Sequence, residues 1–399
     1  MGKYTINDDP LIDQVIESHM QRIVAEITSH LKPTSIILRG SFGRGEGSVI
    51  ELDGIFQFLS DYEIDVTAKS PFHRSFFSKL SRKLSDEFGL QAGIRWMRPD
   101  CLSRDRIGPF PIGKAVPTIS LYEFRYGSQV LWGRDIFSSS PPIYPDQINP
   151  LSGLLLLLNR MAESLLFMRL DDDYFDTACF TYYWINKTIL ACAEALLLIC
   201  KQYHYTYRER EHRFQNLPQT ELAFLGEDVS TVKDMIKSAT EFKLEPSLMH
   251  YPLPVRDTWL QVIPLCKATL RHVMERLSSQ NWEGLLLYPE IYLDYAADNY
   301  QQEYSKYIWL INLYEIYKVI STQRLPQQLR NHHYSIDLVY AAVPLIFLSY
   351  GPNKEEKILF KARNIISKLC DLEPTSHDLD KEWDYLRQKL AALWKVYCY

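Results

Sequence analysis

The sequence predicts an α+β protein, in which a small α/β unit is followed by a larger, all-helical region. Before about residue 145, short apolar runs typical of strands alternate with helical patterns, whereas from residue 151 nearly the whole chain has helical periodicity. Residues 138–150 are rich in serine and proline, which break regular structure. We therefore predict two domains, 1–145 and 146–399, with further division of the second considered near 252 or 326.

The spacing of apolar residues places the individual elements. Helical spacing predicts helices over residues 9–31 and 74–88. Apolar or alternating runs predict strands at 36–38, 62–67, 92–97 and 118–124. In the second region, breaks between helices are expected at 171–173, 216–218, 252–254, 326 and 351–352.

Composition and charge exclude several classes of protein. Hydrophobic residues make up 46% and charged residues 23% of the 399 residues, which is typical of a globular protein and argues against disorder or coiled-coil arrays. With a net charge of -5, the chain has no excess of basic residues for broad electrostatic binding of nucleic acid. Net charge does not exclude a basic groove at one place on the surface.

Cysteine usage and the apolar tracts bear on location. The seven cysteines are scattered and never spaced as C-x-x-C, which argues against a disulfide framework and a structural zinc site. A reducing cytoplasm fits best, and the first residues lack the apolar segment of a signal peptide. The apolar tracts near 154–158 and 189–200 are shorter than a membrane span, so we expect buried core helices and no membrane contact.

The first candidate site is the glycine-rich stretch 38–49. Glycine lets backbone N–H groups approach an anion closely, so this stretch could bind a phosphate. Considered by itself, it fits an ordinary glycine-rich turn equally well. Gly47 is followed by Ser48 instead of the Lys-Ser or Lys-Thr pair of a Walker A loop. The spacing of Gly43, Gly45 and Gly47 also differs from the dinucleotide-binding pattern G-x-G-x-x-G.

Three carboxylates alternate with apolar residues at the next predicted strand. Alternation places Asp61, Glu63 and Asp65 on one face of that strand. A fold tolerates three adjacent acids at a solvated edge or where a divalent cation neutralises them, and oxygen ligands suit Mg²⁺. Combined with an upstream loop that could hold a polyphosphate, the strand favours a joint site for metal and triphosphate.

Together these residues resemble the signature of the DNA polymerase β-like nucleotidyltransferase superfamily: an apolar strand, a Gly-Ser turn opening a helix, and a strand with two carboxylates one residue apart. The similarity covers about residues 33–135, with the motifs at Gly40-Ser41 and at Asp61 and Glu63. The resemblance implies a small catalytic domain with a mixed sheet. It further implies Asp61 and Glu63 as catalytic metal ligands, Gly40 and Ser41 as triphosphate contacts, and Mg²⁺, or alternatively Mn²⁺, as cofactor.

The chain departs from the family pattern in two respects. The gap between Ser41 and Asp61 is longer than usual, which predicts an insertion around residues 51–59. Glu63 with Asp65 also fits the alternation, so the register of the metal-binding pair is open. We prefer Asp61 with Glu63 because a Ser-Asp pair commonly enters this strand in the family, which leaves Asp65 as a supporting acid.

A third acid and several cations complete the candidate site. A third metal ligand is typical of the family; Glu123 is the candidate, and a surface acid or no third ligand is the alternative. Arg44, within the glycine cluster, is expected to reach a phosphate oxygen. In the helical region, Lys187 interrupts an apolar helix, and its partner would be the triphosphate or a buried carboxylate. For Arg160 we favour a buried carboxylate.

Two further motifs have ordinary interpretations. Residues 203–213 mix aromatic and basic side chains that could contact nucleic acid, but interspersed glutamates favour a solvated helix end of mixed charge. The run of three aspartates at 171–173 is expected to form a loop and helix cap, since the spaced ligands of a calcium loop are missing.

The sequence thus predicts a metal-dependent nucleotidyltransferase. It would move a nucleoside monophosphate from a triphosphate such as ATP to an acceptor hydroxyl and release pyrophosphate. A small molecule, a protein and an RNA all stay open as acceptor, because that choice depends on the surface of the helical domain. The donor base and the oligomeric state also stay open. The alternative is a degenerate nucleotide-binding or scaffold protein whose helical domain recognises a protein or RNA.

Overall fold

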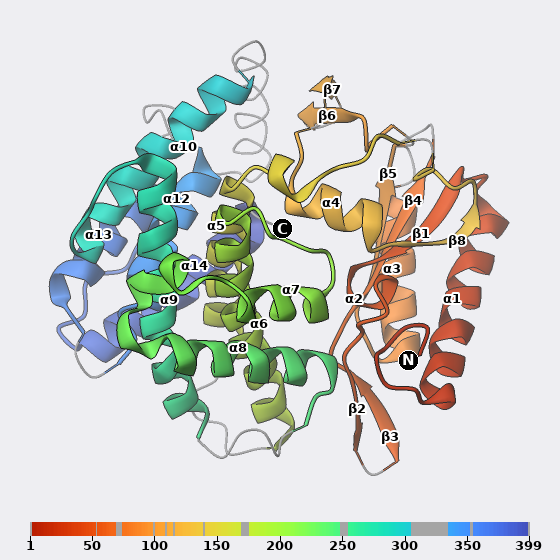
Figure 1. Cartoon of the computed structure of the whole chain (residues 1–399), viewed down its shortest axis with the longest axis horizontal. Coiled ribbons are helices and arrows are strands. Elements are labelled where there is room, and N and C mark those ends of the chain that lie inside the picture. Colours follow the sequence, from red (N-terminus) through yellow and green to blue (C-terminus); the bar gives the residue numbers. More distant parts are fainter. Residues whose placement is uncertain are drawn as a thin grey trace.

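A computed structural model describes residues 2–397 except 53, 69–73, 99, 108–109, 115, 139, 169–174, 248–253, 305–333 and 352–353. Within these residues every strand lies before residue 134, and the chain from residue 151 onward is helical. The strands and the first helices form one side of the molecule, and the later helices form the other (Figure 1). The predicted α+β class, with a small sheet and a larger helical part, is confirmed.

A four-stranded mixed sheet forms the centre of the first part. The strand order is β5-β4-β1-β8, where β4 is parallel to β5 and antiparallel to β1, and β8 is antiparallel to β1. The strands are β1 Ser35–Arg39, β4 Tyr62–Thr67, β5 Ala92–Met97 and β8 Gln129–Gly133. Three of them confirm the expected strands at 36–38, 62–67 and 92–97, whereas the sequence had not indicated β8.

Two helices cover one face of this sheet, α1 Pro10–His30 and α3 Arg74–Phe88. The side chain of Asp9 caps α1 by accepting a hydrogen bond from the Leu11 N–H. Tyr62, Ile64 and Val66 of β4 pack into the same core as these helices. The acidic side chains between them therefore lie on the opposite face of the sheet, as the alternation predicts.

The insertion expected around 51–59 is a β-hairpin. Its strands are β2 Val49–Leu52 and β3 Ile55–Phe58, and Figure 1 shows the ribbon extending away from the sheet. A second hairpin, β6 Arg104–Ile107 and β7 Phe110–Lys114, follows β5. The Gly-Ser turn opens a helix of only four residues, α2 Gly40–Gly43, directly after β1.

The predicted strand at 118–124 is wrong, because these residues begin helix α4 Ile119–Tyr126. Isoleucine, tyrosine and phenylalanine favour strands, but local propensity yields to capping and packing. The Thr118 side chain accepts a hydrogen bond from the Leu121 N–H at the start of the helix. Tyr122 packs against the helical part and Phe124 against the sheet, so a helix buries apolar side chains in both directions.

The helical part has its own large apolar core. Its central helix is α6, which packs against α5, α8 and α9. The tracts 154–158 and 189–200 contribute to this core, as expected. The helices are α5 Leu151–Phe167, α6 Phe175–Ile199, α7 Tyr207–Gln215, α8 Val229–Leu244, α9 Val255–Ser278, α10 Tyr288–Tyr304, α12 Ser335–Phe347, α13 Glu356–Ile366 and α14 Leu379–Tyr397, with short 3-10 helices at Pro145–Gln147, Gln219–Asp228 and Leu285–Leu287.

The expected break at 216–218 falls between α7 and the following 3-10 helix, and Pro254 immediately precedes α9. Gly351 lies between α12 and α13. The breaks predicted at 171–173, 252, 326 and 352 lie outside the described residues.

Candidate functional site

The acidic face of β4 carries Glu63 and Asp65, and two arginines neutralise both. The Nε of Arg39 lies 3.1 Å from a Glu63 oxygen, and its Nη1 lies 3.5 Å from Asp65. Arg95 on β5 lies 3.7 Å from Glu63 and 3.3 Å from Asp65. The Asp65 side chain is fully buried, whereas that of Glu63 is 32% exposed. Accessibility therefore favours Glu63 over Asp65 as a ligand-binding acid.

Asp61 lies just before β4, within electrostatic range of Glu63 in the sheet part and of cations in the helical part. Burial raises its pKa, and the neighbouring Glu63 carboxylate raises it further. Lys187 on α6 and Arg160 on α5 lower it, which places both cations within electrostatic range of the carboxylate. The charged form of Asp61 is thus disfavoured in the absence of a further positive charge.

Gly40 brings the turn into direct contact with the acidic strand. Its φ of +70° lies in the left-handed region that glycine adopts without strain. A Cβ at this position would lie 2.4 Å from Oε1 of Glu63, so any larger residue would displace that carboxylate. The antiparallel register pairs Arg39 with Glu63, which places the following residue, Gly40, beside the acid. The two halves of the predicted motif therefore come together.

Arg44 and Glu123, two residues predicted for the site, form an ion pair with each other. Nη1 of Arg44 lies 3.1 Å from Oε2 of Glu123, and its side chain is only 4% exposed. The other oxygen of Glu123 accepts hydrogen bonds from Tyr203 at 2.6 Å and from Arg210. Burial alone would raise the pKa of Glu123, but Arg44 and Arg210 lower it to about 2. Both oxygens of Glu123 are engaged in this structure, and its predicted role as a metal ligand and that of Arg44 as a phosphate contact stay predictions.

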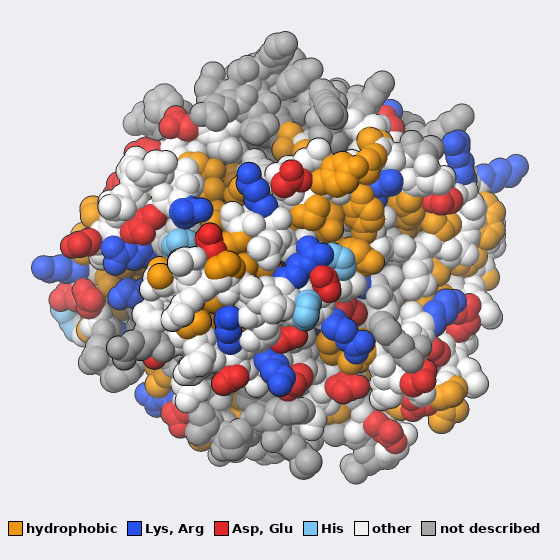
Figure 2. All heavy atoms as spheres, viewed as in Figure 1, with side chains coloured by type: hydrophobic (Ala, Val, Ile, Leu, Met, Phe, Trp, Pro, Cys, Tyr) orange, Lys and Arg blue, Asp and Glu red, His pale blue; other side chains and the backbone are white. Residues whose placement is uncertain are grey.

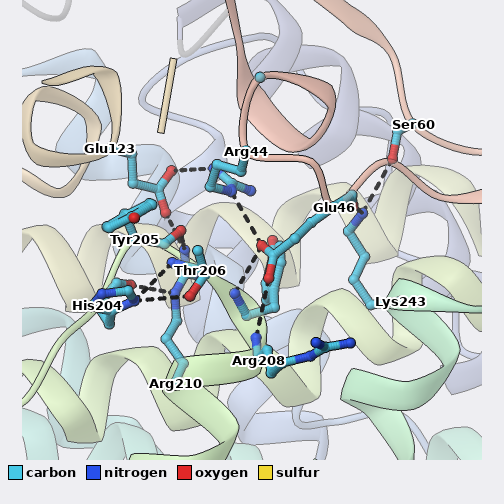
Figure 3. A network of polar contacts seen from close by, with 12 residues as sticks. Arg44, Glu46, Ser60, Glu123, His204, Tyr205, Thr206, Arg208, Arg210 and Lys243 are labelled. Carbon is cyan, nitrogen blue, oxygen red and sulfur yellow. Dashed lines mark hydrogen bonds and ion pairs between the residues drawn. The ribbon is translucent and has the colours of Figure 1, made fainter. Parts of the chain in front are cut away.

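The glycine-rich loop instead fastens the sheet domain to the helical part (Figure 3). The Glu46 carboxylate accepts hydrogen bonds from the backbone N–H groups of Tyr207 and Arg208, at 2.9 and 3.2 Å, at the start of α7. A carboxylate at a helix N-terminus satisfies free N–H donors and matches the helix dipole. Arg210, on the same helix, pairs with both Glu123 and Glu194.

Lys187 and Arg160 act electrostatically on Asp61 from the helical side. Nζ of Lys187 lies 4.2 Å from the ring centre of Trp184 and 5.0 Å from that of Tyr183. Burial, with the nearby charge of Arg160, lowers the pKa of Lys187 to about 8. Arg160 pairs with Glu163 on the same helix, which confirms the expected carboxylate partner. Lys187 stays a candidate phosphate contact.

Sequence reasoning missed Lys243, at the C-terminal end of α8. It is 1% exposed, and its Nζ lies 2.6 Å from the Ser48 hydroxyl and 3.1 Å from that of Ser60, the residue before Asp61. A signal was present: Lys243 continues the apolar stripe of α8 seven residues after Ile236.

The aromatic and basic stretch 203–213 divides between the interface and the surface. Tyr203, Tyr207 and Arg210 are buried, whereas Arg208 and His212 are exposed. On the exposed side, Arg213 and Glu209 form an ion pair of 2.8 Å, in keeping with the expected helix of mixed charge. Figure 2 shows basic and acidic side chains interspersed on this face of the molecule.

Asp61 and Glu63 are the candidate carboxylates for a metal ion, and Glu63 also pairs with Arg39 and Arg95. Among the described residues, no group of three or more histidine, cysteine, aspartate or glutamate side chains is arranged to hold one. Mg²⁺ commonly uses only one or two protein carboxylates and completes its shell with water and substrate phosphates. Burial, followed by the charge of the adjacent Glu63, raises the pKa of Asp61, and a bound cation would favour its charged form. The donor chemistry of this pair therefore fits Mg²⁺.

Comparisons with known protein families, with curated proteins and with solved structures find no match to this chain. In the part of the chain that the structure describes, no helix has the length and apolar character needed to cross a membrane.

Proposed function

We propose that the protein is a metal-dependent nucleotidyltransferase, which transfers a nucleoside monophosphate from a triphosphate to an acceptor hydroxyl and releases pyrophosphate. One observation carries this proposal. The Glu63 carboxylate lies against Gly40 of the Gly-Ser turn, while Asp61, two residues earlier, is within electrostatic range of Lys187 and Arg160. An acid pair, a glycine turn and external cations are the components that phosphoryl-type transfer requires in one place.

Each group has a defined task in this proposal. Asp61 and Glu63 would hold Mg²⁺, which, when bound, neutralises charge on the phosphates. The missing side chain of Gly40 lets the turn lie directly against the Glu63 carboxylate, so that a triphosphate held by the turn would lie beside the metal ligand, and Ser41 would donate a hydrogen bond to an outer phosphate. Lys187 adds a positive charge from the helical side. Catalysis then depends on holding the acceptor hydroxyl in line with the α-phosphorus.

The proposed location is the cytoplasm, and the proposed acceptor is a molecule with a free hydroxyl group. A cytoplasmic location would supply free triphosphate and Mg²⁺, and the acceptor would approach from the helical part, which forms the larger share of the chain. Its identity as small molecule, protein or RNA is left to experiment.

A second candidate function, a nucleotide-binding or scaffold protein without transfer activity, has one observation in its favour. Arg39 and Arg95 already neutralise Glu63 and Asp65, so the acidic strand is stable without a metal ion. Such a protein could bind a triphosphate but would not release pyrophosphate.

Replacing either proposed metal ligand separates the two candidates. Asp61→Asn and Glu63→Gln should each lower nucleotide transfer at least about a hundredfold, because each removes a charge that acts in the transition state and leaves the side-chain volume unchanged. The assay follows label from an α-labelled triphosphate into acceptors of a cell extract. Asp86→Asn and Glu51→Gln, at exposed positions of α3 and β2, make the same chemical changes and should retain wild-type transfer. Near-normal turnover in Glu63→Gln would remove this strand from the site.

A further inference from the structure

Lys243 is a buried lysine whose amine donates hydrogen bonds across the junction between the two parts of the protein. Nζ approaches three oxygen atoms: the hydroxyl of Ser48 at 2.6 Å, the hydroxyl of Ser60 at 3.1 Å and the backbone carbonyl of Glu46 at 3.5 Å. Three acceptors match the three N–H donors of an ammonium group. The Ser48 hydroxyl in turn donates to the Lys243 carbonyl at 2.5 Å. Figure 3 shows the amine pointing toward Ser60 from α8.

These contacts join the two ends of the inserted hairpin. Ser48 precedes β2 and Ser60 follows β3, and the Ser48 N–H donates to the Ser60 hydroxyl at 3.0 Å. The N–H groups of Leu59 and Ser60 both donate to the Ser48 carbonyl. Ser60 is bonded directly to Asp61, and Glu46 belongs to the glycine-rich loop. One amine therefore links the entry of the acidic strand to that loop.

Burial of this amine is costly for the fold. Burial lowers the pKa of Lys243 well below its ordinary value, and the positive charges of Lys187 and Arg44 lower it further. The rings of Tyr183 and Tyr207 are also close, with centres 5.5 and 5.4 Å from Nζ. A methionine would fill the same space without a polar group to desolvate. Stability alone does not explain a lysine at this position.

We propose that Lys243 is a positioning residue, which fixes Asp61 relative to the Gly-Ser turn and the helical part. This inference rests on the proposed function, because it assigns Lys243 a task in the same site. A carboxylate that shifts by about 1 Å can cost about a hundredfold in rate when geometry controls the reaction. The contact reaches Asp61 through Ser60, so Lys243 itself need not touch a substrate.

The test compares Lys243→Met with Lys233→Met, on the same helix, where the half-buried Lys233 donates from Nζ to the Gln215 carbonyl. Lys243→Met should lower kcat for transfer roughly 10- to 100-fold while its melting temperature stays equal or rises. Both hydroxyls keep a second hydrogen bond in this variant, so the fold persists. Lys233→Met should leave kcat unchanged. Ser60→Ala added to Lys243→Met should lower kcat little further, because both act through one contact.

A second readout is independent of activity. Amide hydrogen exchange at Leu59 and Ser60 should become faster in Lys243→Met and stay unchanged in Lys233→Met. The inference would be overturned if Lys243→Met kept wild-type kcat and unchanged exchange. It would also be overturned if the loss of kcat came with a lowered melting temperature, because general destabilisation would then explain it. If the wild-type protein transfers no nucleotide, the proposed function fails, and the exchange measurement alone then decides whether Lys243 positions this segment.

Discussion

Replacing Asp61 with asparagine is expected to raise the melting temperature of the metal-free protein and to abolish its stabilisation by Mg²⁺ with a non-hydrolysable triphosphate. Burial and the adjacent Glu63 carboxylate disfavour the charged form of Asp61, and asparagine removes that cost. In the wild-type protein, a ligand that binds only the folded state should add about 2.7 kcal/mol at a concentration near 100 times its dissociation constant. Thermal melts with and without the ligands measure both effects.

The pH dependence of this difference has a definite sign. The pKa of Asp61 is raised in the folded state, so its neutral form is favourable below the unfolded pKa, and stability is lost as pH rises through the folded pKa. The advantage of Asp61→Asn should therefore be small in acid and largest at neutral pH. Asp86→Asn, at an exposed position, serves as the matched control. Equal melting of Asp61→Asn and wild type at neutral pH, with no ligand shift in either, would make this acid an ordinary surface group.

Glu123→Gln is expected to destabilise the protein by about 3–5 kcal/mol, the usual cost of removing one partner from a buried ion pair. The substitution leaves Arg44 and Arg210, each with a 4% exposed side chain, without their shared carboxylate. Urea unfolding at neutral pH measures the loss. Glu209→Gln, which breaks an exposed ion pair within α7, should cost at most about 1 kcal/mol.

Acid should remove the difference between wild type and Glu123→Gln. Glu123 has its pKa lowered from 4.5 to about 2, so its contribution of about 3 kcal/mol is present above pH 4.5 and is lost as pH falls through about 2. A cost below about 1 kcal/mol at neutral pH would show that the interface does not depend on this carboxylate.

Much of the sheet domain follows from sequence alone, because burial on one face imposes a period of two on β4. Tyr62, Ile64 and Val66 are apolar for that reason, and the alternation also placed Glu63 and Asp65 correctly. The segment 118–124 was predicted as a strand because apolar and polar residues alternate in it, but this alternation does not come from one buried face of a sheet. Tyr122 and Phe124 are apolar since α4 packs against both the helical part and the sheet, and only the tertiary structure reveals that.

The polar partners in the junction could not be predicted in the same way. Arg44 and Glu46 lie in a loop that resembles a phosphate site, yet their partners are Glu123 and the start of α7. Lys243 lies 195 residues from Ser48 in the sequence, and no local pattern joins the two. A charged residue on an apolar stripe indicates a buried polar contact, but it does not name the partner.

Parallel reactions with α-labelled and γ-labelled triphosphates test the proposed transfer most directly. The protein is incubated with Mg²⁺ and a cell extract as the source of acceptor, with Asp61→Asn as the control. We predict that the α-label enters a new product and the γ-label leaves as pyrophosphate, and that Asp61→Asn does neither. Appearance of the γ-label in a product that forms with the wild-type protein and not with Asp61→Asn, or no difference between the two proteins with any of the four nucleotides, would contradict the assignment of this protein as a nucleotidyltransferase.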